Sequence, residues 1–315
     1  MLLWALLPSP KFEPNLEESD KNVQGIWMTN VGASVLHHTL TLDNALYNLA
    51  DSGYNQIYVS TYGLVGTIYP SEAVKSHPIF LPPFTDVLKA VSKEGNRQSL
   101  QVYAWLEYGL MLHPTNEVAI ANPEWLLQTP EGETIVNDFV WLNPEHPEVQ
   151  EYILQIISEV SQYNLTGIQL DDHWSVPIQF GNKVQAMNEL TAKIRQTMKE
   201  INPDLKLSIS PNPYGFSLKK YNQDWLHWAK QGYIDEVALQ VYRPTSDEFA
   251  KSIQSSQIQQ LPADIPVVIG IYTGSWVSLL PHEEIDKQIE ITKNLNYGYS
   301  LFCWEYRIFS LISSP

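Results

Sequence analysis

The sequence of 315 residues predicts a single-domain TIM barrel, a closed (β/α)8 sheet surrounded by helices. From Gln24 onward, short apolar strands alternate with amphipathic helices, which is the pattern of βαβ units and a parallel sheet. Eight such units follow one another, and this fold typically takes about 250 residues. A doubly wound open sheet is the alternative, but the G-x-G-x-x-G nucleotide fingerprint expected after its first strand is absent from the sequence.

The elements are expected to alternate, with each strand a short apolar segment and each helix an amphipathic one. The expected strands are Gly25–Thr29, Gln56–Thr61, Leu100–Leu106, Gly167–Asp171, Lys206–Ser210, Glu236–Tyr242, Pro266–Tyr272 and Ser300–Glu305. The expected helices are Leu42–Ser52, Phe84–Glu94, Pro147–Tyr163, Lys183–Ile201, Gln223–Gln231, Asp247–Gln257 and Glu283–Leu295, with room for a short closing helix in Arg307–Pro315. One long connection, Tyr108–Glu145, follows the third strand, where enzymes of this fold carry loops over the active face.

The strand pattern shows which residues line the barrel, because alternate residues of a strand point to opposite faces. In the fourth strand, Ile168 and Leu170 form the apolar face that packs on helices, so Gln169 and Asp171 point inward. The same pattern sends these residues inward from the third, fifth and sixth strands: Gln101, Tyr103, Trp105, Glu107, Ser208, Ser210, Glu236, Gln240 and Tyr242, with Asn212 at a strand exit. A purely structural barrel fills these layers with Val, Ile and Leu, so polar and aromatic residues here indicate a site.

Charge and composition exclude several classes of function. The chain carries 19 basic and 35 acidic side chains, a formal net charge of −16. Nucleic acids and anionic membranes are bound mainly through Lys and Arg, so no nucleic-acid partner is expected. No stretch approaches the length of a membrane span. The single cysteine, Cys303, excludes an internal disulfide and a cysteine-based zinc site.

The first 22 residues are expected to lie outside the fold, and residues 23–315 to form the barrel domain. Met1–Leu7 is apolar but has no basic residues before it, and Pro8 and Pro10 follow at once. Two interpretations therefore stay open, the remnant of a trimmed export signal and a simple hydrophobic start.

Carboxyl groups at strand ends are the first candidates for chemistry, because barrel active sites lie at that face. These groups are Glu107 after the third strand, Asp171 and Asp172 after the fourth, and Glu305 after the eighth. Glycoside hydrolysis usually needs two carboxyl groups beside one bond, an acid and a nucleophile or base. Adjacent carboxylates raise one another's pKa, which suits an acid. The structural alternative is that these residues cap helices or pair with Arg243 and Arg307.

Aromatic residues accumulate at strand exits and in the loops that follow. They are Trp105, Tyr108, Trp125, Trp141, Trp174, Tyr214, Tyr242, Tyr272, Trp276 and Trp304. Each alone is more often a core or loop anchor, but together they indicate stacking positions along a cleft for an extended glycan.

Asp171, Asp172 and His173 also fit a metal-dependent hydrolase, since Asp and His are ordinary metal ligands. No H-x-x-x-H or similar spacing accompanies them, so no metal and no cofactor are expected. A serine hydrolase is disfavoured because the sequence contains no G-x-S-x-G elbow.

Five motifs carry a family resemblance. They are Gly25–Asn30 (GIWMTN), Trp141–Pro144 with His146–Val149, Gly167–His173 (GIQLDDH), Ser210–Pro213 (SPNP) and Gln240–Arg243 (QVYR). In this order they resemble the glycosyl-hydrolase-like family 10 proteins, bacterial TIM barrels, and in particular their cyanobacterial branch. The resemblance runs from about Val23 to Arg307. It implies glycoside hydrolase activity on a bacterial glycan, and one branch includes division-site enzymes that cut peptidoglycan strands stripped of their peptides.

The resemblance also implies roles for single residues. Asp171 matches an aspartate in a strand similar to the G-F-R-x-D strand of the α-amylase superfamily, whose aspartate is the nucleophile, and Glu107 and Glu305 match glutamates of the close branch. The amylase-like acid that ends the fifth strand has no counterpart, because Ser210–Asn212 stands there. The second strand reads Ser60–Leu64 instead of a Trp-rich segment, which alters one wall of the cleft.

The sequence therefore predicts a glycoside hydrolase that cleaves an oligo- or polysaccharide, either peptidoglycan glycan or exopolysaccharide. Asp171 is expected to be the nucleophile or charge stabiliser, and Glu107, then Asp172, then Glu305 the acid. The expected sugar contacts are Asn143, His173, Asn212, Gln240 and Tyr242, with Trp105, Trp174 and Trp304 as stacking platforms.

Three other functions stay open. They are a non-catalytic glycan-binding barrel, the metal-dependent hydrolase, and a scaffold for protein partners. A peptidoglycan substrate implies export of the protein. The acidic chain favours a neutral or amino sugar over an anionic polymer.

Overall fold

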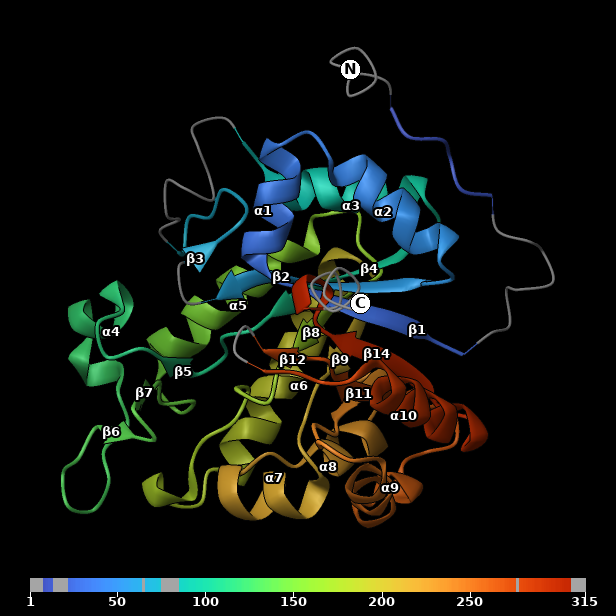
Figure 1. The fold of residues 1–315 in the computed structure, drawn as a ribbon. Coiled ribbons are helices and arrows are strands. Elements are labelled where there is room, and N and C mark those ends of the chain that lie inside the picture. Colours follow the sequence, from blue (N-terminus) through green and yellow to red (C-terminus); the bar gives the residue numbers. More distant parts are fainter. Residues whose placement is uncertain (1–7, 14–21, 64–65, 75–84, 276–277, 307–315) are drawn as a thin grey trace.

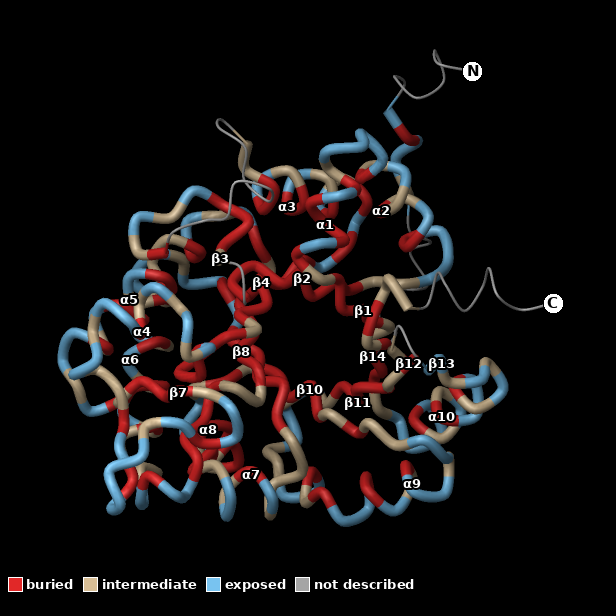
Figure 2. The backbone as a smooth tube through the Cα atoms, turned by 60° about the vertical axis from the view of Figure 1, so that its left-hand side comes forward, coloured by how far each residue is buried: buried red, intermediate tan, exposed pale blue. Residues whose placement is uncertain are grey.

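A computed structural model describes residues 8–13, 22–63, 66–74, 85–275 and 278–306. Eight parallel strands form a closed barrel with helices around it (Figures 1 and 2). Neighbours in the ring are neighbours in the chain, and β1 pairs with both β2 and β14, which closes the sheet. The predicted single-domain TIM barrel is confirmed.

The barrel strands agree with the predicted ones, usually to within two residues at each end. They are β1 (Gln24–Met28), β2 (Gln56–Gly63), β4 (Gln101–Leu106), β8 (Gly167–Leu170), β9 (Lys206–Ile209), β10 (Glu236–Gln240), β11 (Val267–Tyr272) and β14 (Gly298–Phe302). The largest difference is in β14, which begins two residues before and ends three residues before the predicted strand Ser300–Glu305.

The helices that cover the barrel include all seven predicted ones. The covering helices are α1 (Asn30–His38), α2 (Leu42–Asp51), α3 (Val87–Arg97), α5 (Pro147–Ser161), α6 (Val184–Ile201), α8 (Trp225–Lys230), α9 (Ser246–Ser255) and α10 (His282–Asn294). The sequence analysis missed α1. Thr29 caps this helix, because its hydroxyl accepts from the Gly32 N–H at 3.1 Å. The predicted closing helix Arg307–Pro315 lies outside the described residues, as do Met1–Leu7 and Trp276.

Short helices and strands lie in the loops at the C-terminal end of the barrel strands. They are β3 (Gly66–Thr67), β5 (Met111–Leu112), α4 (Glu117–Ala121), η3 (Pro123–Trp125), β6 (Ile135–Val136), β7 (Phe139–Trp141), η4 (Ile178–Phe180), α7 (Tyr214–Tyr221), β12 (Gly274–Ser275) and β13 (Ser278–Leu279), with η5 (Ile258–Gln260) after α9. The long connection predicted after the third strand contains β5, β6 and β7, which form a separate antiparallel sheet (Figure 1). Met111 at the start of this sheet pairs with Trp141 at its end.

The strands separate two cores, as their alternating pattern predicts. Outward residues such as Ile168, Leu170 and Leu239 pack with the helices. The interior holds a smaller aromatic cluster of Trp27, Tyr58, Tyr103, Trp105, Ala238, Val268 and Cys303. Gln101, predicted to point inward, is instead exposed where β4 begins.

Buried polar side chains link the aromatic residues inside the barrel. The Glu236 carboxylate accepts from Ser208 Oγ at 2.7 Å and from Tyr58 OH at 2.9 Å. Ser208 Oγ in turn accepts from Gln169 Nε2 at 3.1 Å, and Gln169 Oε1 accepts from the Trp27 indole N–H at 2.7 Å. Since every link is a hydrogen bond, the chain fixes the orientation of the Trp27 ring.

Residues 8–13 contact the outside of the barrel. The Ser9 N–H donates to Asp43 of α2 at 2.8 Å, and the Ser9 carbonyl accepts from Arg97 of α3 at 3.0 Å. Part of the segment expected outside the fold thus packs against two covering helices.

Candidate active site

A pocket of about 220 Å³ lies at the mouth of the barrel where the strands end. It is lined by Trp27, Trp105, Glu107, Asp171, Asp172, His173, Ser210, Gln240, Tyr242 and Phe302. Because parallel strands bring their carboxyl ends to one rim, residues distant in the sequence meet here. We call this the first pocket.

Asp171 occupies the floor of the first pocket directly after β8 and is only 5% exposed. Its Oδ1 accepts from the Asp172 N–H at 2.9 Å and from Gln240 Nε2 at 2.7 Å. Burial raises the pKa of the Asp171 carboxyl well above its usual range, and the charges of Asp172 and Glu107 raise it further. The Asp172 N–H opposes this shift, and the two donors together hold the carboxylate in one orientation.

Glu107 is the second carboxyl group of the first pocket and follows β4. Burial raises its pKa, while a hydrogen bond from Ser60 Oγ to Glu107 Oε2, at 3.0 Å, and nearby His173 lower it. A Cβ on Gly63 would lie 2.8 Å from Glu107 Oε2, so the glycine in β2 leaves space for this carboxyl.

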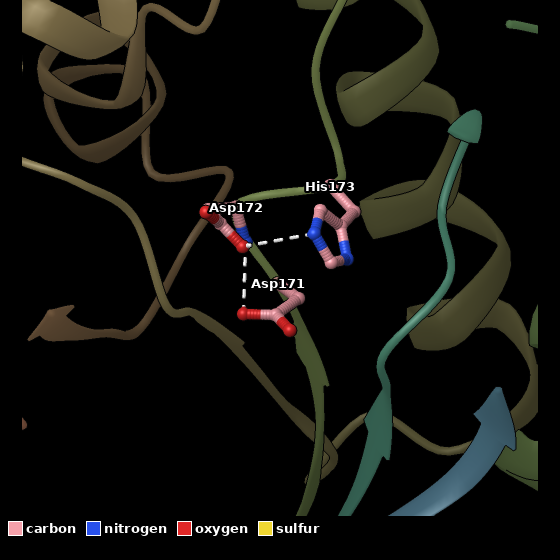
Figure 3. Close-up of side chains that lie close together, drawn as sticks. All are labelled: Asp171, Asp172 and His173. Carbon is pink, nitrogen blue, oxygen red and sulfur yellow. Dashed lines mark hydrogen bonds and ion pairs between the residues drawn. The ribbon is translucent and has the colours of Figure 1, made fainter. Parts of the chain in front are cut away.

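Asp172 and His173 stand beside Asp171 at the entrance (Figure 3). Asn212 Nδ2 donates to Asp172 Oδ2 at 2.8 Å, and Asp172 Oδ1 lies 3.7 Å from His173 Nε2. The other ring nitrogen of His173 lies 2.9 Å from the carbonyl oxygen of Glu107. One potential ligand atom from each of Asp171, Asp172 and His173 lies within 4.8 Å of the others, so a cation could contact all three after small movements.

Three other predicted contacts also line the first pocket. Tyr242 stacks on Phe302 with ring centroids 5.5 Å apart. Gln240, besides holding Asp171, donates to the Ser210 carbonyl at 3.1 Å. The buried indole N–H of Trp105 lies near Asp171 and lowers its pKa, yet makes no hydrogen bond of good geometry with the described residues. An acceptor atom of a bound ligand would satisfy this donor.

Four predicted site residues are placed elsewhere. Trp174 is buried between barrel and helices, where its indole N–H donates to Thr191 of α6 at 3.0 Å. Trp304 borders a gap between α2 and α10. Asn143 Oδ1 accepts from the Glu145 N–H at 3.0 Å, shortly before α5 begins.

Glu305 is the fourth of these residues and lies where α1 begins. Its Oε1 accepts from the Thr29 N–H at 3.0 Å and from the Thr29 hydroxyl at 2.6 Å. Glu305 is absent from the residues that line the first pocket. This position matches the structural alternative, in which an acidic residue at a strand end anchors a helix.

Trp27 and Phe302 line the first pocket but were not singled out from the sequence. The alternation of β1 carries the signal for Trp27, because Ile26 and Met28 pack on the helices and Trp27 must then point inward. Phe302 ends a strand whose boundaries were displaced in the prediction, so its direction could not be read.

The sequence matches the family model described as "Glycosyl hydrolase-like 10" over residues 22–188 and 182–291. The chain belongs to the glycosyl hydrolase-like 10 family. The match covers β1 through most of α10, so seven of the eight barrel strands and the three carboxyl groups of the first pocket, Glu107, Asp171 and Asp172, lie within the family region.

Two curated relatives of this glycosyl hydrolase-like 10 protein are similar over part of their length. "Glycosyl hydrolase YngK" of Bacillus subtilis is 23% identical over 280 residues, which cover 71% of this chain and 55% of the relative. "Glycosyl hydrolase DigH" of Escherichia coli K12 is 25% identical over 214 residues, which cover 54% of this chain and 49% of the relative. The chain thus spans about half the length of the curated relatives it matches.

Solved structures of glycoside hydrolases share the fold of this family member. The glycoside hydrolase domain of PgaB (BpsB) from Bordetella bronchiseptica has a TM-score of 0.69 at 12% identity and covers 91% of this chain and 95% of that one. An α-galactosidase from Thermus thermophilus, solved in complex with stachyose, has a TM-score of 0.62 at 12% identity. The match covers 99% of this chain and 68% of the α-galactosidase chain.

None of the helices in the described residues is both long enough and apolar enough to cross a membrane.

Proposed function

We propose that this protein hydrolyses glycosidic bonds of a bacterial glycan at the first pocket. The observation that carries the proposal is the pair Asp171 and Glu107, two carboxyl groups with raised pKa values that line one small pocket at the barrel mouth. Membership of a glycosyl hydrolase-like family supports it. Glycoside hydrolysis needs such a pair, one group ionised and one protonated.

Asp171 acts at the anomeric carbon, as nucleophile or as stabiliser of the positive charge that develops there. Asp172 N–H and Gln240 Nε2 donate to its Oδ1, and donors of this kind favour the ionised carboxylate. Both hydrogen bonds of good geometry that the described residues donate to this carboxylate end on Oδ1. Asp171 Oδ2 is therefore the oxygen available to the sugar.

Glu107 donates a proton to the departing oxygen. Burial keeps this carboxyl protonated to higher pH than an exposed glutamic acid. Asp172 is the second candidate for this role, because it also lines the first pocket, but it is held by Asn212. Trp27, Trp105 and Tyr242 supply the aromatic walls against which sugar rings pack.

The charges of the first pocket favour a neutral or amino sugar. Its acidic groups are Glu107, Asp171 and Asp172, and none of its described lining residues is lysine or arginine. A sugar with a carboxylate would meet repulsion with no compensating cation. Neutral exopolysaccharides and polymers of N-acetylglucosamine are therefore the substrates to test first, and peptide-free peptidoglycan glycan, whose muramic acid carries a carboxylate, tests the charge argument itself.

The test is mass spectrometry of products after wild type and Asp171→Asn are incubated with peptide-free peptidoglycan glycan and with neutral polysaccharides. Shorter oligosaccharides are expected from wild type alone. Asp264→Asn, at an exposed aspartate shortly before β11 begins and so at the opposite end of the barrel from the pocket, is the matched control and should behave as wild type. Cleavage by Asp171→Asn at the wild-type rate would remove Asp171 from the chemistry.

Two other results would replace the proposal. Binding without cleavage by the wild type across the panel would indicate a glycan-binding barrel. Loss of cleavage on treatment with a chelator, restored by added metal, would indicate that Asp171, Asp172 and His173 hold a cation.

A further inference from the structure

A second pocket of about 330 Å³ opens beside the first one. Its walls come from the inserted sheet β5–β7, from the loop after β8 and from α7. It is lined by Met111, Asn137, Phe139, Trp141, Asp172, His173, Ser175, Asn212, Phe216, Ser217, Tyr221 and Gln223. Asp172 and His173 line both pockets, so the two spaces meet at these residues.

The second pocket has aromatic surfaces on opposite sides. Phe139 and Trp141 belong to β7, whereas Phe216 and Tyr221 belong to α7 with ring centroids 5.5 Å apart. Phe216 is 49% exposed even though its ring contacts that of Tyr221, so one side of the ring is open to the pocket. Exposed rings that border a pocket suit the apolar faces of a sugar.

Polar groups in the second pocket are placed to bind hydroxyl groups. Ser175 is only 1% exposed, and its hydroxyl has no hydrogen-bond partner in the described residues. Asn137 reaches Tyr221 OH with its side-chain amide at 3.4 Å, a long contact that joins the two walls. A buried hydroxyl without a partner is costly, and a ligand oxygen would remove that cost.

We propose that the second pocket binds the sugar that is linked to the reacting sugar, so that the substrate spans Asp172 and has at least two units. This inference rests on the proposed hydrolysis at the first pocket. The first pocket alone is smaller than the about 300–1,000 Å³ typical of ligand sites. None of the described residues lining the second pocket is lysine or arginine, which extends the preference for neutral or amino sugars to this unit.

The test compares two kinds of substrate in wild type and Phe216→Ala. One kind is the oligosaccharides of glucose and of N-acetylglucosamine, two to six units long. The other kind is the glycosyl fluorides of the same two sugars, in both anomers, which place one sugar in the first pocket and nothing in the second. Phe216→Ala should lower kcat/KM about tenfold for oligosaccharides and leave it unchanged for the fluorides.

Two further variants control the comparison. Ile201→Ala removes an exposed apolar residue at the end of α6, at the opposite end of the barrel, and should leave both activities unchanged. Phe216→Tyr keeps an aromatic ring and should restore most of the oligosaccharide activity.

The outcomes separate the two proposals. If the wild type cleaves oligosaccharides and Phe216→Ala cleaves them equally well, the second pocket is not a sugar subsite. An equal loss on oligosaccharides and fluorides would overturn the inference as well, since it would show a general disturbance. Failure of the wild type on these substrates and on the glycans named under the proposed function would instead refute the hydrolysis itself.

Discussion

At the scale of single residues, the first pocket depends on two carboxyl groups that burial shifts in the same direction. Asp171 must be ionised to act, and its pKa is raised, so cleavage should fall as the pH falls through this raised value. Glu107 must be protonated, and its pKa is raised too, so cleavage should persist above the usual range of a glutamic acid before it falls. The whole pH profile is therefore displaced upward.

Glu107→Gln tests this assignment. Loss of the acid should lower kcat by about 10²–10⁴-fold for an ordinary glycan and remove the fall in rate at high pH. An activated aryl glycoside, whose leaving group needs little protonation, should lose much less. The measurement is kcat against pH for both substrates. Equal losses on the two substrates would mean that Glu107 acts in some other way.

The site residues that could be predicted from the sequence are those in or directly after a barrel strand. Asp171, Gln240 and Trp105 were assigned to the barrel mouth because each lies in or directly after a strand whose alternation fixes its direction. Trp174 lies four residues beyond the end of β8, where alternation no longer holds, and its ring turns toward α6. Phe216 and Tyr221, in the short helix α7 after β9, gave no such signal, because their position depends on tertiary packing.

At the scale of elements, the loops after β4 and β8 touch through a glycine. A Cβ on Gly109 would lie 2.8 Å from the carbonyl oxygen of His173 and 3.0 Å from the Cα of Trp174. Both obstacles are backbone atoms, which cannot rotate away. This close approach holds Asp172 and His173 at the junction of the two pockets.

Gly109→Ala should therefore push the loop after β8 outward, with a loss of about 1–3 kcal/mol of stability and a marked loss of activity. Gly215→Ala in α7 is the control, because the nearest atom to its Cβ is 3.6 Å away and Ala favours a helix. Urea unfolding and glycan cleavage measure the two effects. Wild-type behaviour of Gly109→Ala would show that the loops adjust freely.

The strands and most helices of the barrel could be predicted from their hydrophobic periodicity, whereas the short elements in the loops could not. Eight strands and seven helices have long, regular patterns. The two- and three-residue strands β5, β6 and β7 are too short for a periodic signal, and only the length of the Tyr108–Glu145 connection indicated them. Helix α1 was missed although Thr29 supplies a cap.

At the scale of the whole molecule, the buried polar side chains around Glu236 inside the barrel make the stability of the fold depend on pH. Burial raises the pKa of Glu236. Hydrogen bonds donated to its carboxylate by Gln56, Ser208 and Tyr58 lower the pKa and offset part of this rise. The folded protein therefore binds this proton more tightly than the unfolded chain. Stability should accordingly decrease as the pH rises from the unfolded pKa through the raised folded one.

Glu236→Gln should flatten this dependence. Between pH 5 and pH 8 the wild type should lose stability that the variant keeps, as measured by urea unfolding at both values. Gln56 Oε1 is buried without a partner in the described residues. If the Gln56 amide rotates, this oxygen accepts from the side-chain amide of the new Gln. Glu290→Gln, at an exposed position, should follow the wild type. A slope unchanged in Glu236→Gln would assign the pH dependence to other groups.

The inserted sheet enters and leaves the barrel at one place, because Met111 and Trp141 are paired neighbours. A segment with adjacent ends behaves as a cassette, since its sequence can change without altering the spacing of the strands that carry Asp171 and Glu107. Evolution could thus retune which glycan is accepted while the hydrolytic centre stays constant. An engineer could do the same by transplanting this cassette between family members.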